Sequence, residues 1–74
     1  MAIIFSVRGD YIQLDQLLKA TGLCSSGGLA HAEIEAGNVL VDGLAESRKR
    51  AKLRPGQHVS YAGDVVELVA ERMP

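Results

Sequence analysis

Two side chains have the types and spacing that nucleophilic catalysis would need. Cys24 lies just before an expected helix N-terminus, where the helix dipole favours the thiolate, and His31 follows seven residues later. That separation is about two helical turns, so both side chains could share one face. The alternative is a small, buried and inert cysteine. We favour the inert cysteine, because a chain of 74 residues has little room for a substrate cleft.

Metal and nucleotide sites are poorly supported. The ligand supply is Cys24, His31 and His58, and no pair has zinc-site spacing, so we expect no metal and no cofactor. Residues 22–28 resemble a glycine-rich phosphate loop but lack the Lys and Ser/Thr that should follow, and a helix precedes them instead of a strand. The two serines and two successive glycines of residues 25–28, which include Ser26 and Gly27, could still hold one backbone phosphate of a larger ligand at a helix N-terminus.

The basic side chains are concentrated in one short segment. The net charge of the chain is −1, yet residues 48–54 carry five basic side chains and no acidic one. On an edge strand such residues discourage edge-to-edge pairing, which is the simplest interpretation. Three consecutive charges would, however, fall on both faces of a strand, and they follow an Asp42-Gly43 turn that fixes their position. Phosphate is the ligand that arginine forks suit best, so we expect phosphate contacts here.

Base stacking is not expected to contribute. The aromatic side chains are limited to Phe5, Tyr11 and Tyr61. Domains that read single strands by stacking present several aromatic rings on one surface. The sequence therefore favours recognition through shape and phosphate.

The elements that position these residues can be predicted from local pattern. Residues 2–7 predict a strand; Leu14, Leu17 and Leu18 lie on one face of a helix that Gly22 ends. Ser25 or Ser26 caps a second helix that runs to about Ala36. Later strands are expected at 39–41, 44–46, 57–61 and 64–70. The fold class is α+β: a short N-terminal strand and a two-helix hairpin packed on a small antiparallel β-sheet.

Size and composition narrow the class further. The chain is 74 residues long and 47% hydrophobic, which suits one small globular domain covering residues 1–74. It contains no apolar run long enough to cross a bilayer, no signal peptide pattern, and one cysteine, so we expect no membrane partner and a cytoplasmic location.

The order of motifs resembles the S4 RNA-binding domain over residues 12–60. The similarity rests on residues 14–19, residues 22–26, and Ala30, Ile34, Gly37, Val39, Val41, Asp42, Gly43, Pro55 and Gly56. The family recurs in ribosomal proteins, pseudouridine synthases and tyrosyl-tRNA synthetases. Residues 46–52 resemble its small stand-alone bacterial members, in which the domain is almost the whole protein. The resemblance implies an S4-like (αL motif) fold.

The sequence departs from the family at four positions that commonly face RNA. Gln13 and Gly27 stand where the family usually has arginine, His31 where it has arginine or glutamine, and Leu40 where lysine is frequent. The resemblance implies that the helical hairpin contacts RNA, whereas the clustering of basic side chains indicates residues 48–54. We interpret the basic segment as taking over much of the phosphate contact.

These observations predict a non-enzymatic module that binds structured RNA, with ribosomal RNA as the expected target and ribosome assembly or translation as the process. We expect a monomer, with ribosomal proteins as further candidate partners. The alternative is a protein-interaction adaptor that has lost RNA affinity, as a pI near 6.0 and the four replaced positions would allow. Catalysis by Cys24 is the weakest hypothesis. The expected RNA-binding residues are Gln13, Ser26, Gly27, His31, Arg48, Lys49, Arg50, Lys52 and Arg54.

Overall fold

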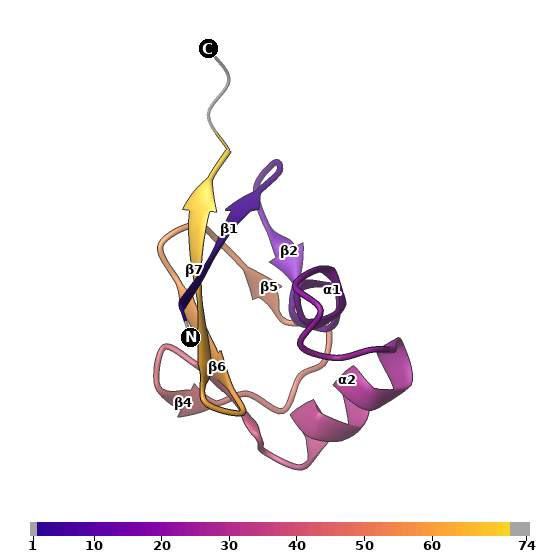
Figure 1. Ribbon diagram of the computed structural model, residues 1–74. Coiled ribbons are helices and arrows are strands. Elements are labelled where there is room, and N and C mark those ends of the chain that lie inside the picture. Colours follow the sequence, from indigo (N-terminus) through magenta and orange to yellow (C-terminus); the bar gives the residue numbers. More distant parts are fainter. Residues whose placement is uncertain (1, 72–74) are drawn as a thin grey trace.

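Two short helices cover one side of a five-stranded sheet, and a separate two-stranded ladder lies beside the first helix (Figure 1). The computed structural model describes residues 2–71. The elements follow in the order β1 (Ala2–Val7), β2 (Ile12–Gln13), α1 (Leu14–Ala20), α2 (Gly27–Glu35), β3 (Val39–Val41), β4 (Leu44–Ala45), β5 (Lys52–Leu53), β6 (His58–Tyr61) and β7 (Asp64–Ala70).

The helical hairpin forms where the sequence predicts it. Gly22 has a φ of +78°, the left-handed conformation that lets the chain leave α1 without steric strain. Ser26 is the N-cap of α2, and its Oγ accepts a hydrogen bond from the Leu29 N–H at 3.1 Å. The predicted helices and their terminating residues are therefore confirmed.

The large sheet is mixed, with strand order β1-β7-β6-β3-β4. Its later strands pair antiparallel, as predicted. Asp42 and Gly43 have φ values of 51° and 84°, which match the type I′ turn expected between β3 and β4. The N-terminal strand joins the sheet differently, because β1 pairs in parallel with β7 along its whole length. A purely antiparallel sheet is thus extended by one parallel edge strand.

The small ladder joins segments that are distant in sequence. Ile12 pairs with Leu53 and Gln13 with Lys52, so β2 and β5 lie side by side (Figure 1). The sequence pattern predicted neither β2 nor the pairing of the two segments. The interpretation of residues 48–54 as a strand with charges on both faces was wrong for its first half, since 48–51 form a loop and only Lys52–Leu53 is a strand.

One core lies between the helices and the sheet. Its fully buried side chains come from both helices, both sheets and the N-terminal strand, and the largest are Leu14, Leu17, Leu18, Ile34, Leu53 and Leu68. Burying a leucine or isoleucine side chain contributes about 1.5–3 kcal/mol. The core therefore fixes the helices, and with them the start of α1, against the sheet.

Candidate nucleic-acid interface

The basic segment lines a groove on the surface. Arg48, Arg50, Ala51, Lys52 and Arg54 surround a volume of about 480 Å³, which we call the basic groove. The four charged side chains are exposed, whereas Ala51 and Leu53 are buried between them. The two apolar side chains thus anchor the segment and leave its cations facing solvent.

Backbone hydrogen bonds attach the basic groove to the first turn of α1. The Leu14 N–H donates to the Ala51 carbonyl at 2.9 Å, and the Asp15 N–H donates to the Lys49 carbonyl at 3.0 Å. Amide groups at the start of a helix have no acceptor within the helix. Here the basic loop supplies the acceptors, so the position of its cations is tied to the helical hairpin.

Asp15 connects the hairpin to the basic groove a second time. His31 Nε2 on α2 lies 2.9 Å from Asp15 Oδ2, and Asp15 Oδ1 accepts from the Gln16 N–H at 2.8 Å. Burial would raise the pKa of Asp15, but the His31 hydrogen bond, the Gln16 amide and the Arg50 charge together lower it below its usual value. The carboxylate is therefore charged at neutral pH, contacts His31 and is stabilised by the positive charge of Arg50.

Arg48 is held by an acidic neighbour. Its Nε and Nη2 donate to the two carboxylate oxygens of Glu46 at 3.1 and 3.0 Å, and its N–H donates to Glu46 as well. These hydrogen bonds from Arg48 lower the pKa of Glu46. Within residues 2–71, by contrast, Lys49, Arg50 and Arg54 form no ion pair, so their charges are open to an anionic ligand.

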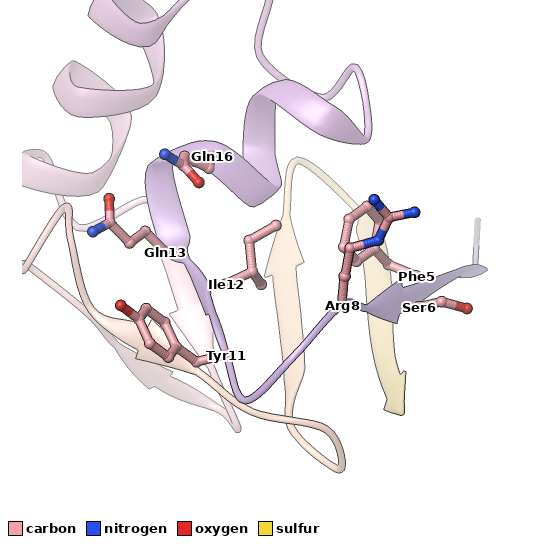
Figure 2. A pocket seen from close by; sticks show the side chains of 7 residues that line it. All are labelled: Phe5, Ser6, Arg8, Tyr11, Ile12, Gln13 and Gln16. Carbon is pink, nitrogen blue, oxygen red and sulfur yellow. The ribbon is translucent and has the colours of Figure 1, made fainter. Parts of the chain in front are cut away.

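A second groove adjoins the first. Phe5, Ser6, Arg8, Tyr11, Ile12, Gln13 and Gln16 line a volume of about 430 Å³, which we call the side groove (Figure 2). Lys52 Nζ lies over the Tyr11 ring, 5.0 Å from its centroid, and Gln13 pairs with Lys52 in the β2–β5 ladder. Gln13, a predicted site residue, therefore lies where the two grooves meet.

The remaining predicted residues lie at the start of α2. Ser26 is exposed, and its hydroxyl oxygen is used to cap the helix. At Gly27 an added Cβ would lie 3.9 Å from Lys19 Nζ. Lys19 thus brings a cation to the position where Gly27 lacks one. The sequence did not indicate Lys19 as a site residue, because it is a single lysine in an acidic segment.

The catalytic arrangement of Cys24 and His31 is not formed. Cys24 is buried, and burial raises the pKa of its thiol. The side-chain hydrogen bond with Tyr61 offsets only part of this effect. His31 contacts Asp15 instead. The interpretation of Cys24 as a buried core residue is therefore the one that the structure supports.

A metal centre and a membrane-spanning helix are both absent from the part of the chain that the structure describes. No three metal-binding side chains come together there. No helix there has the length and apolar character needed to cross a membrane.

Comparison with known proteins adds independent information. A sequence model of the S4 domain matches residues 5–70. YbcJ of Escherichia coli (strain K12) is 47% identical over 70 residues, which cover 95% of this chain and 100% of that protein, and YbcJ of Shigella flexneri matches equally well. The tyrosine–tRNA ligase of Ralstonia nicotianae is 42% identical over 57 residues, which cover 77% of this chain but 14% of the ligase.

A solved structure has the same fold. The solution structure of YbcJ from E. coli, described as revealing an αL motif involved in RNA binding, superimposes with a TM-score of 0.65. It is 40% identical in sequence and covers 93% of this chain and 86% of that one. The predicted S4-like α+β fold is confirmed by this match.

Proposed function

The chain belongs to the S4 domain family, and from that premise we propose that it is a non-enzymatic, monomeric module of residues 1–74 that binds structured RNA in the cytoplasm through phosphate contacts. Ribosomal RNA is the proposed target, with ribosomal proteins as neighbouring partners. Ribosome assembly or translation is the proposed process.

The basic groove is the observation that carries this proposal. It gathers four cationic side chains around one hollow, and its backbone is fixed to α1 by two hydrogen bonds. Phosphates spaced along an RNA backbone are multivalent anions, so several cations on one fixed stretch of backbone can bind them together. The rest of the chain is acidic, which concentrates the positive potential at this groove.

The helical hairpin extends the proposed surface. His31 contacts Asp15, whose carboxylate also feels the charge of Arg50, and Lys19 lies beside Gly27 at the start of α2. An RNA backbone that follows the basic groove could therefore continue along the hairpin. Gln13, Ser26, Gly27 and His31 would orient that backbone, and Arg48, Lys49, Arg50, Lys52 and Arg54 would neutralise it.

The salt dependence of RNA binding tests the proposed phosphate contacts. Four or five contacts should give a slope of log K against log salt of about −3 to −4. Replacing Arg48, Lys49 and Arg50 together with glutamine should reduce the slope to about −1 and remove most RNA that copurifies at low salt. The matched control replaces Arg48 and Arg50 with lysine, which keeps the charge and should keep most of the slope.

The copurified RNA should be sequenced in the same experiment. Enrichment of ribosomal RNA that disappears in the glutamine variant would support the proposed target. Enrichment of another structured RNA would contradict ribosomal RNA as the target and leave the groove as the binding surface. An affinity that does not respond to salt would contradict the mechanism.

A protein-interaction adaptor is the second candidate, and the Glu46–Arg48 ion pair favours it because it neutralises one cation of the groove. The acidic pI of about 6.0 points the same way. In that case the purified protein would carry no nucleic acid, and the glutamine variant would lose an acidic protein partner.

A further inference from the structure

We propose that the side groove holds one unpaired nucleotide of the RNA whose backbone occupies the basic groove. This inference rests on the proposed function and adds to it the class of RNA: a helix interrupted by a bulged or looped-out base. The family resemblance assigns RNA contact to the helical hairpin and, among the residues of this groove, to Gln13 alone; it assigns no base to the groove.

The lining of the side groove has the chemistry of a base pocket. Phe5 and Tyr11 provide aromatic rings, and Gln13 and Gln16 provide amides that can both donate to and accept from the edge of a base (Figure 2). A volume of about 430 Å³ lies within the range of small-ligand sites. Figure 2 shows Tyr11 and Gln13 on one side of Ile12 and Phe5 with Arg8 on the other, so Tyr11 is the ring on which one base could stack beside the glutamine amides.

The side chains of this groove are available to a ligand. Tyr11 and Gln16 are exposed, and Phe5 is half-buried, so its ring is fixed by the fold. Arg8 has an exposed side chain, and its ion pair with Glu71 is long, at 3.4 Å. Exposed pairs of this kind contribute little to stability, so a nucleotide phosphate could replace Glu71 as the partner of Arg8.

The two grooves come close to each other at Tyr11 and Lys52. Lys52 lines the basic groove, and its ammonium group lies over the Tyr11 ring in the side groove. A phosphate held by Lys52 would therefore place its attached nucleoside within reach of Tyr11. A base that leaves the RNA helix next to that phosphate could stack on the Tyr11 ring and reach the glutamine amides.

Three RNA probes test this assignment. The first is a fluorescent duplex of about 16 base pairs, the second carries one central unpaired adenosine, and the third carries an abasic site at the same place. The natural protein should bind the adenosine bulge about tenfold more tightly than either other probe. The readout is the ratio of bulge affinity to duplex affinity, in which the shared phosphate contribution cancels.

Two substitutions should remove this preference. Tyr11→Leu keeps apolar bulk without a ring, and Gln16→Ala removes one amide from an exposed helical position; each should reduce the ratio to within about twofold of one. Glu35→Ala, on the exposed end of α2, is the control and should keep the ratio. Circular dichroism verifies that all variants are folded.

The outcomes separate the two proposals. A ratio near one for the natural protein, or a ratio that both variants retain, would overturn the nucleotide pocket while duplex binding still supports the proposed function. Failure of the natural protein to bind any of the three probes would overturn the proposed function, and the nucleotide pocket with it.

Discussion

Asp15 is the residue at which the parts of the proposed surface meet. Its carboxylate accepts from the Gln16 amide, contacts His31 on the other helix and lies in the field of Arg50. Its side chain is 12% exposed, so these partners replace most of its hydration. One charged side chain therefore joins α1, α2 and the basic groove.

Asp15→Asn should destabilise the fold by about 1–3 kcal/mol at pH 7, because hydrogen bonds to a charged acceptor are replaced by weaker ones. The folded-state pKa of Asp15 is lowered from 3.8, so its contribution is present above that pH and is lost as the pH falls through the folded value. Urea unfolding of both proteins at several pH values measures this difference. A difference that stays constant down to about pH 2 would contradict an ionic role.

Glu46→Gln should strengthen RNA binding. The substitution releases Arg48 from its ion pair and removes a negative charge beside the basic groove, while the amide oxygen can still accept from the Arg48 N–H. The salt slope should become steeper by about one phosphate contact, or about 0.7–0.9. Fluorescence anisotropy with the duplex probe measures it; weaker binding would instead mean that Glu46 orients Arg48 for RNA.

At the scale of elements, the helical hairpin depends on how each helix begins and ends. α1 is closed by Gly22 in a left-handed conformation, whereas Gly28 lies inside the first turn of α2 with ordinary helical geometry. The two glycines therefore have opposite roles in stability.

Gly22→Ala should lower stability by about 1–2 kcal/mol, since a Cβ at positive φ is strained even though no atom lies within 4 Å of it. Gly28→Ala should raise stability by about 0.4–1 kcal/mol, because the new methyl group would meet only Ser26 Oγ at an ordinary 3.9 Å. Thermal unfolding distinguishes them, at about 4–8 °C per kcal/mol. Equal shifts in the same direction would contradict this assignment of conformational roles.

Elements with a strong local signal could be predicted from the sequence. Leucine spacing, a serine cap and an Asp-Gly turn each act over a few residues, and the corresponding helices and hairpin are confirmed. The β2–β5 ladder could not be predicted, because two residues show no periodicity and their partners are distant in sequence. The parallel pairing of β1 had no local signal either, since a strand pattern does not identify its neighbour.

The candidate site also has one part that the sequence could predict and another that it could not. The clustering of charge in residues 48–54 is visible in the sequence, and the roles of its residues remain predictions. The contact between Asp15 and His31 depends on how two helices pack, and the presence of Phe5 and Tyr11 in one groove depends on where β1 ends. Spatial proximity of this kind is a property of the tertiary structure and leaves no mark on residue spacing.

At the scale of the molecule, stability rests on one small core. Leu68 on β7 is 1% exposed, whereas Ile4 on the neighbouring strand is 70% exposed. Small domains have little stability in reserve, on the order of 5 kcal/mol. Truncating one large core side chain should therefore destabilise the whole molecule, including the basic groove on its surface.

Leu68→Ala should cost about 2–5 kcal/mol and leave much of the protein unfolded at 37 °C. Ile4→Ala is the matched control on β1 and should change stability by less than about 0.5 kcal/mol. Chemical denaturation measures both. A comparable loss in the two variants would mean that the outer face of β1 is covered by another surface in solution.

The parallel pairing of β1 with β7 also bears on how the chain is synthesised. β1 is made early, yet its hydrogen-bonding partner is the last strand of the sheet, so the strand waits unpaired while nearly the whole described chain emerges. Contacts between segments so far apart in sequence raise the contact order and slow folding. The helical hairpin, by contrast, can form from neighbouring residues alone. The nascent chain should therefore present its helices before its sheet is closed, and final closure must wait until β7 has left the exit tunnel.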